Sequence, residues 1–132
     1  MDLKSIQVDK TLEKEGQWIE LVDEFHVKIR SVHNTDYRRA VRAQIDRVVD
    51  KSRKKRSRLS TEAIEEINIR CAYPHLVVDW RGLEEDGKEV KCNKENVIRI
   101  FTELNYLWAI VQEEAGLIKT FRKPTEDEIE GN

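Results

Sequence analysis

Alternating apolar and polar residues predict a β-hairpin near the N-terminus. One side of the alternation is apolar (Phe25, Val27, Ile29) and the other is polar (His26, Lys28, Arg30). This period of two is typical of a strand with one buried face. Asp23-Glu24 fits a short turn, so we expect strands over residues 17–22 and 25–32. Because an isolated hairpin is barely stable, we expect it to pack on other elements.

A helical period follows the hairpin. Residues of one face recur at spacings of three and four (Tyr37, Ala40, Val41, Gln44, Ile45, Val48, Val49). Asn34 or Thr35 is a suitable N-cap, and Asp36 is favourable in the first turn. The opposite face carries Arg38, Arg39, Arg42 and Arg47. This is the clearest amphipathic helix of the chain, and its apolar stripe stops at the basic segment 51–58.

Further helices are predicted on both sides of an extended segment. Ser60 is the expected cap of a helix that ends at Pro74, with Ala63, Ile64, Ile67 and Cys71 on its buried face. Residues 76–80 read as a short strand. An acidic, turn-rich loop follows, and it contains Gly82, Asp86 and Gly87.

Asn93 is the predicted cap of the next helix, whose stripe is Val97, Ile100, Phe101 and Leu104. Asn105 is a candidate interruption before a last helix over residues 106–121, with Leu107, Ile110, Val111, Glu114 and Ile118 on one side. We interpret Trp18 and Trp80 as core anchors. Tyr106 and Trp108 are candidates for contact with a partner.

The predicted fold class is α+β, mostly α. An N-terminal β-hairpin packs on a small bundle of about four helices, with one short additional extended segment. Residues 16–122 form the single domain that a chain of 132 residues allows. Residues 1–15 are expected to be a flexible arm, or a strand that orders on a partner, and residues 123–132 a disordered acidic tail.

Charge is strongly segregated along the chain. Residues 34–60 hold ten Lys and Arg against three Asp, a balance of +7, whereas the remainder holds 14 basic and 23 acidic residues, a balance of -9. This distribution is typical of proteins that self-associate or dock on an acidic partner. The run at 51–58 has six basic residues in eight, but no aromatic residues interleave with it to stack on bases. Protein docking or a solvated helix end is therefore favoured over nucleic acid.

No catalytic or metal-binding motif is visible. Cys71 and Cys92 lack CxxC spacing, and the three histidines are scattered (His26, His33, His75). The loop from residue 79 to 89 fails the EF-hand pattern, because Arg81 and Leu83 stand where oxygen ligands are needed. We therefore expect no enzyme, cofactor or metal. The N-terminus lacks the apolar region of a signal peptide and no apolar run approaches the roughly 20 residues of a membrane span, so we expect a soluble cytosolic protein.

Two groups of motifs resemble the tail assembly chaperone family of long-tailed bacteriophages and prophages. The first is Gly16-x-Trp18, then Phe25-x-Val27-Lys28-Ile29, then Asn34-x-x-Tyr37-Arg38. The second is Val78-Asp79-Trp80-x-Gly82, then Asp86-Gly87-Lys88, a capped helix at Asn93 and a helix ending in Ala115 before Phe121. The resemblance covers residues 16–122, and it departs at His33, where a glycine is expected.

This resemblance implies a non-enzymatic late protein of virion morphogenesis in the host cytoplasm. Such chaperones bind the tape measure protein, recruit tail tube protein subunits and are absent from the mature virion. Our hypothesis is that the basic face (Arg38, Arg39, Arg42, Arg47) contacts an acidic surface on a partner or on a second copy. Two alternatives stay open: a small nucleic-acid-binding regulator with a basic helix, and a structural head-tail connector or tail completion protein.

Overall fold

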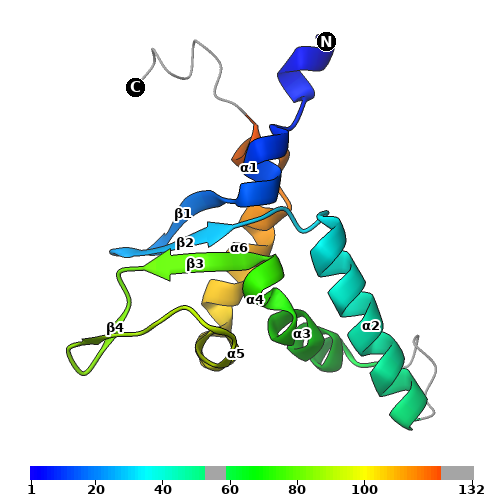
Figure 1. The fold of residues 1–132 in the computed structure, drawn as a ribbon, viewed down its shortest axis with the longest axis vertical. Coiled ribbons are helices and arrows are strands. Elements are labelled where there is room, and N and C mark those ends of the chain that lie inside the picture. The colour runs from blue at the N-terminus through cyan, green and yellow to red at the C-terminus, as the bar shows by residue number, and fades with distance from the viewer. Residues whose placement is uncertain (53–58, 123–132) are drawn as a thin grey trace.

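The computed structural model describes residues 1–52 and 59–122, which form a mixed α+β fold (Figure 1). The N-terminal elements are the 3-10 helix η1 (Leu3–Ile6), the helix α1 (Lys10–Glu15) and the strands β1 (Gln17–Val22) and β2 (Phe25–Ile29). The predicted hairpin is confirmed, although β2 ends at Ile29. The basic residues 53–58 and the predicted acidic tail 123–132 lie outside the described residues.

Helices dominate the rest of the chain, as predicted. In order, the elements are α2 (Thr35–Ser52), α3 (Thr61–Arg70), α4 (Ala72–His75), β3 (Val77–Arg81), β4 (Glu84–Glu85), β5 (Lys88–Glu89), α5 (Lys94–Glu103), α6 (Asn105–Ala115) and the 3-10 helix η3 (Ile118–Phe121). The caps at Ser60 and Asn93 are confirmed, because their side chains accept hydrogen bonds from Ala63 N and Asn96 N. No helix in the described ranges is long and apolar enough to span a membrane.

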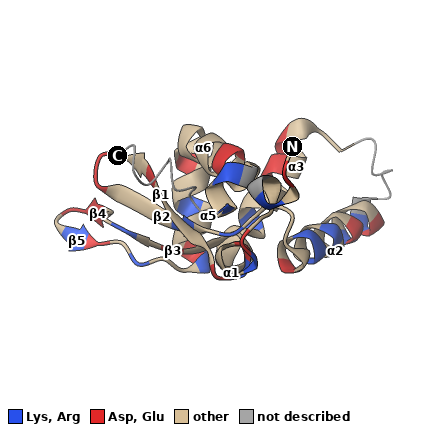
Figure 2. Ribbon diagram, turned by 90° about the horizontal axis from the view of Figure 1, so that it is seen from above, with Lys and Arg blue, Asp and Glu red and all other residues tan. Residues whose placement is uncertain are grey.

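The extended segment predicted after Pro74 is the third strand of the sheet. The order is β1-β2-β3, with both pairs antiparallel. Val27 in the middle strand pairs with Ile19 on one side and with Trp80 on the other. Because side chains alternate across a strand, these three residues share one face. Helices α5 and α6 cover one face of the sheet (Figure 2).

A chain of aromatic rings joins the sheet to these helices. Phe25 lies 5.6 Å from Trp80, Trp80 lies 6.1 Å from Phe101 of α5, and Phe101 lies 5.5 Å from Trp108 of α6, measured between ring centroids. All four side chains are buried. The Trp80 indole Nε1 donates to Val90 O at 2.7 Å and so fixes the loop after β3. Trp80 is therefore the core anchor that the sequence predicted.

The prediction for Trp18 is corrected. Trp18 pairs with Lys28 and shares the opposite face of the sheet, where it is half-buried. The Arg81 guanidinium lies over its ring, with Cζ 4.6 Å from the centroid. Trp18 thus packs under a surface arginine instead of in the core, because its position in the strand directs it to the same face of the sheet as the polar residues.

Two helix predictions and one loop prediction also change. Helix α3 buries Ile67 and Ile69 and leaves Ile64 exposed, and it ends at Arg70, so Pro74 lies in the separate helix α4. The predicted helix over residues 106–121 ends at Ala115, where Gly116 N donates to Gln112 O, and η3 follows. The loop after Gly82 contains the small β4–β5 hairpin.

The first fifteen residues differ from the expected arm or strand. Asp9 caps α1 by accepting hydrogen bonds from Thr11 N and Leu12 N through its side chain. Its own backbone N–H donates to Phe121 O at 2.8 Å. Local capping chemistry therefore produces a helix here, and one hydrogen bond ties the start of α1 to η3.

Candidate functional site

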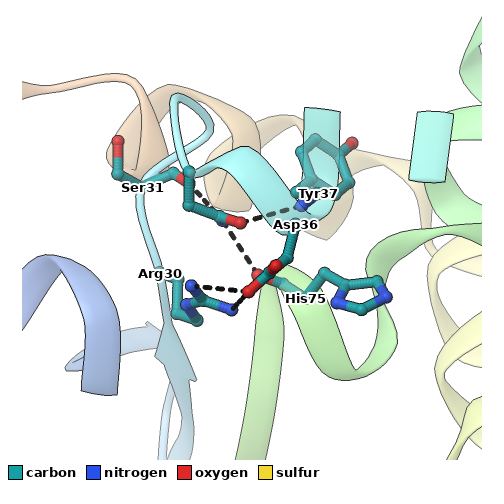
Figure 3. Close-up of polar contacts among 6 residues, drawn as sticks. Arg30, Ser31, Asp36, Tyr37 and His75 are labelled. Carbon is teal, nitrogen blue, oxygen red and sulfur yellow. Dashed lines mark hydrogen bonds and ion pairs between the residues drawn. The ribbon is translucent and has the colours of Figure 1, made fainter. Parts of the chain in front are cut away.

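Asn34 anchors the basic helix α2 at its first turn. Its side-chain Oδ1 accepts a hydrogen bond from Tyr37 N at 2.8 Å, which makes it the N-cap. Its Nδ2 donates to Ser31 O at 2.6 Å and to His75 O at 3.0 Å. Asn34 is 6% exposed, so these bonds are shielded from water. One amide therefore satisfies three backbone groups and ties α2 both to the chain after β2 and to α4 (Figure 3).

An ion pair and a tyrosine support the same junction. Both terminal nitrogens of the Arg30 guanidinium lie 3.3 Å from Asp36 Oδ2, and Figure 3 shows this contact beside Tyr37. The Tyr37 side chain is buried, and its hydroxyl donates to Asn68 O of α3 at 3.4 Å. Burial raises the pKa of the Tyr37 hydroxyl. The first turn of α2 is therefore held on three sides.

Beyond Tyr37, helix α2 is incompletely covered. No residue from Arg38 to Lys51 is buried, and the apolar stripe of Val41, Ile45, Val48 and Val49 is only half-buried. Figures 1 and 2 show α2 extending away from the sheet and from α5 and α6. The predicted amphipathic helix is thus present, but its apolar side meets little of the rest of the chain.

The arginines predicted to form one face lie in three places. Arg38 and Arg42 line a groove of about 240 Å³ between α2 and α3, together with Tyr37, Val41, Ile45 and Asn68. We call this the α2–α3 groove. Half-buried Val41 and Ile45 lie beside two exposed guanidinium groups in it. Such a groove suits an amphipathic helix that carries carboxylates beside its apolar stripe.

Arg47 lines a different hollow on the other flank of α2. This hollow of about 290 Å³ also contains Arg70, His75 and Lys94, and no Asp or Glu within residues 1–52 and 59–122 lines it. Arg39 is exposed and lines neither space. A turn of 100° per residue places Arg38 and Arg42 on one flank and Arg47 on the other. The structure therefore brings together Arg38 and Arg42 only.

The two predicted aromatic contact residues are separated as well. Tyr106 is 58% exposed and lines a cleft near the β1–β2 turn. Trp108 is 0% exposed and packs against Phe101, which corrects the expectation that it faces a partner. Two residues along a helix correspond to about 200°, so neighbouring aromatics of this spacing point in opposite directions.

The remaining motif residues have structural positions. Gly16 joins α1 to β1, and Asp79 lies on the open face of β3, where its Oδ1 accepts a hydrogen bond from Trp80 N. Asp86 and Gly87 form the turn between β4 and β5, with φ of 53° and 76°. Gly82 follows β3 and packs tightly against the β1–β2 turn. Sequence reasoning missed Asn68 and the bridge to His75, because both contacts are long-range.

The two cysteines are held protonated at neutral pH. Burial, and to a smaller extent Asp79, raises the pKa of the Cys92 thiol to about 12. Burial also raises the pKa of the Cys71 thiol. Neither thiol has the low pKa of an activated nucleophile. In the ranges 1–52 and 59–122, no three His, Cys, Asp or Glu side chains gather in a group that could hold a metal ion.

Comparison with known proteins gives one result. No match was found among curated proteins or among solved structures. A family described as YdaY prophage protein matches residues 32–132, which is more than half of the chain and includes the Asn34 junction, α2, the α2–α3 groove and all later elements. The chain therefore belongs to the YdaY prophage protein family.

Proposed function

We propose that this prophage protein is a tail assembly chaperone, which binds the tape measure protein and recruits tail tube subunits to it. It acts in the host cytoplasm through binding alone, and it is absent from the mature virion. Its membership of a prophage family and the motif resemblance support this proposal. The observation that carries it is the incompletely covered apolar stripe of α2, which leaves the α2–α3 groove open.

A client helix fits this groove by chemistry. A long helical tape measure protein exposes apolar stripes that would aggregate without cover. Val41 and Ile45 offer apolar surface to such a stripe, and Arg38 and Arg42 offer positive charge to acidic residues beside it. Binding of an amphipathic helix in a groove uses this combination of contacts.

The groove is also held in place before a client arrives. Its wall α2 is fixed by the Asn34 amide, and its floor is tied to α3 by the bond from the Tyr37 hydroxyl to Asn68 O. A preorganised surface loses less conformational entropy on binding than a mobile one. The anchored first turn therefore favours binding at Arg38 and Arg42 over binding further along α2.

Co-purification with helical fragments of the tape measure protein tests the proposal. The double variant Arg38→Glu, Arg42→Glu should weaken binding by about tenfold or more, which corresponds to about 1.4 kcal/mol. Because both side chains are exposed, the melting temperature should stay nearly unchanged. The matched control is Lys10→Glu, Arg39→Glu, which changes the net charge equally at positions outside the groove.

Equal binding by wild type, test variant and control would remove the α2–α3 groove as the client site. A second measurement addresses the wider proposal. Mass spectrometry of purified particles should find the tail tube protein and not this chain. Its presence in stoichiometric amounts would instead support a structural connector.

A second candidate function rests on the hollow around Arg47. Arg47, Lys94 and His75 line it together with Arg70, whose guanidinium is paired with the Glu66 carboxylate at 3.0 Å. The positive charge of Arg47 and Lys94 suits a phosphate group of a nucleic acid. A gel-shift titration across a salt series tests this candidate, because phosphate binding weakens steeply with salt. The variant Arg47→Gln, Lys94→Gln should abolish the gel shift. The variant Arg38→Glu, Arg42→Glu should instead weaken the client binding described above.

A further inference from the structure

A cleft with acidic and apolar walls lies near the β1–β2 turn. It has a volume of about 590 Å³ and is bounded by that turn, by the segment after β3 and by the α5–α6 junction. We call it the acidic cleft and define it by Val22, Asp23, Glu24, Leu83, Glu84 and Tyr106. Figure 1 places the β1–β2 turn and α2 at opposite ends of the molecule.

The apolar part of the acidic cleft is unusually open. Val22 is 40% exposed and Tyr106 is 58% exposed, and both are among the few large apolar side chains that the described surface exposes this far. Leu83 beside them is half-buried. Clustered apolar exposure with a polar rim is typical of an interaction site.

The charge of the cleft has one sign. Asp23, Glu24 and Glu84 are exposed, and no Lys or Arg among the described residues lines the cleft. Carboxylates that share a site repel one another, and a positively charged partner relieves this repulsion. The occupant of the cleft should therefore be basic as well as partly apolar.

The cleft is also rigid at its base. A Cβ on Gly82 would stand 2.0 Å from Glu24 O, so the chain after β3 lies directly against the β1–β2 turn. In the same turn, His26 Nδ1 lies 2.9 Å from Glu24 O. Two acidic walls of the cleft are thus fixed relative to each other, which lowers the entropic cost of filling it.

Helix α2 has the complementary surface. Arg38 and Arg42 lie beside half-buried Val41 and Ile45, so this flank offers positive charge next to apolar side chains. The two surfaces lie at opposite ends of one molecule and cannot meet within it (Figures 1 and 2). We propose that the acidic cleft binds the Arg38–Arg42 flank of α2 from a second copy of this chain.

This contact joins two different surfaces, so it is heterologous. A heterologous contact forms rings if its rotation closes and open filaments if it does not. The self-association itself needs no other protein. If the proposed client binding also holds, the client and the second copy compete for the same flank of α2, and self-association then protects the open apolar stripe until a client arrives.

Sedimentation velocity of the purified chain tests the proposal. Wild type should associate with increasing concentration, and association should weaken by about tenfold or more as salt shortens the Debye length from about 10 Å to about 3 Å. The variant Arg38→Glu, Arg42→Glu and the variant Glu24→Arg, Glu84→Arg should each be monomeric. Circular dichroism checks that both are folded, and Arg38→Gln, Arg42→Gln gives a milder form of the same change.

Mixing distinguishes a heterologous contact from general stickiness. In an equimolar mixture of the two variants, the unchanged acidic cleft of one can bind the unchanged α2 of the other, and the reversed cleft of the second can bind the reversed α2 of the first. The mixture therefore contains two matched pairs of surfaces, whereas each variant alone contains none. We expect the mixture to associate about as strongly as wild type, with the two variants alternating, whereas each variant alone stays monomeric. A chain that carries all four reversals should associate like wild type, because both charges have been exchanged.

Each of these results either supports or overturns the proposed self-association. A wild type that stays monomeric at every concentration and salt overturns the proposal, and so does association of either folded double variant at wild-type strength. A mixture that stays monomeric also overturns it. No client is present in these experiments. Their failure would therefore leave the result of the tape measure pull-down unaffected, and failure of the pull-down would leave the self-association results unaffected.

Discussion

The side-chain Nδ2 of Asn34 donates a hydrogen bond to the backbone oxygen of His75, 41 residues further along the chain, at 3.0 Å. This bond joins the start of α2 to the end of α4. The same amide accepts from Tyr37 N and donates to Ser31 O. The direction in which α2 leaves the body of the protein is therefore set at one side chain.

The variant Asn34→Ala should lower the free energy of unfolding by about 3 kcal/mol. About 1 kcal/mol of this comes from the lost N-cap, and the rest comes from the unpaired carbonyls of Ser31 and His75 in a buried place. Chemical denaturation measures the change. Hydrogen exchange should in addition become faster in the first turn of α2.

The matched control for this prediction is Asn93→Ala. Asn93 caps α5 in the same manner but is exposed, and among the described residues its side chain bonds only Asn96 N. Its loss should cost about 1 kcal/mol. Equal costs for the two variants would mean that the bridge from Asn34 to His75 contributes nothing to stability.

Local sequence patterns predicted the features that depend on residues close together in the sequence. The alternation around Val27 predicted the hairpin, and the caps at Asn34 or Thr35, at Ser60 and at Asn93 predicted three helix starts, because capping needs only residues three positions apart. The bridge to His75 could not be predicted in this way. It depends on how α4 packs, which no local period encodes.

The candidate site was predicted less well for the same reason. The prediction placed all four α2 arginines on one face, although a turn of 100° per residue already separates Arg47 from Arg38 and Arg42. The packing of α3 and α4 then decides that Arg38 and Arg42 share a groove and that Arg47 lines a different hollow. In α6, the predicted stripe used Ile110 and Glu114. Leu107 and Val111 of that stripe are buried as predicted, but Trp108 and Ala115 are buried with them in place of Ile110 and Glu114. Both sets have spacings of three and four, which fit a helix equally well.

The variant Gly82→Ala should destabilise the protein by about 3 kcal/mol or more. Its φ of 81° disfavours a side chain, and the added Cβ would overlap Glu24 O. Thermal unfolding measures the loss. The control Gly87→Ala has a similar φ of 76° but nothing within 4 Å of its Cβ, so it should cost about 1 kcal/mol. A loss as small at Gly82 as at Gly87 would contradict the close approach of the two turns.

Stability should fall at high pH through Cys92. Its pKa is raised from 9.0 to about 12 in the folded protein, so the folded state holds the proton more tightly than the unfolded state. The stabilising contribution is complete below pH 9 and is lost as pH rises toward 12. Denaturation across this range should be less steep in pH for Cys92→Ala than for wild type. An identical slope would show that Cys92 ionises as freely in the folded as in the unfolded chain.

Tyr106 and Trp108 should give opposite results when each is replaced by alanine. Trp108 is fully buried against Phe101, so Trp108→Ala should cost about 3–5 kcal/mol through the cavity that it leaves. Its indole Nε1 has no acceptor among the described residues, so Trp108→Phe should cost much less.

Tyr106 is mostly exposed, so Tyr106→Ala should change stability by no more than about 0.5 kcal/mol. The same substitution should weaken self-association, because it removes the largest apolar side chain at the open side of the acidic cleft. Denaturation and sedimentation of the two variants separate these effects: a Tyr106→Ala chain that unfolds early would mean that this ring supports the fold instead of a partner.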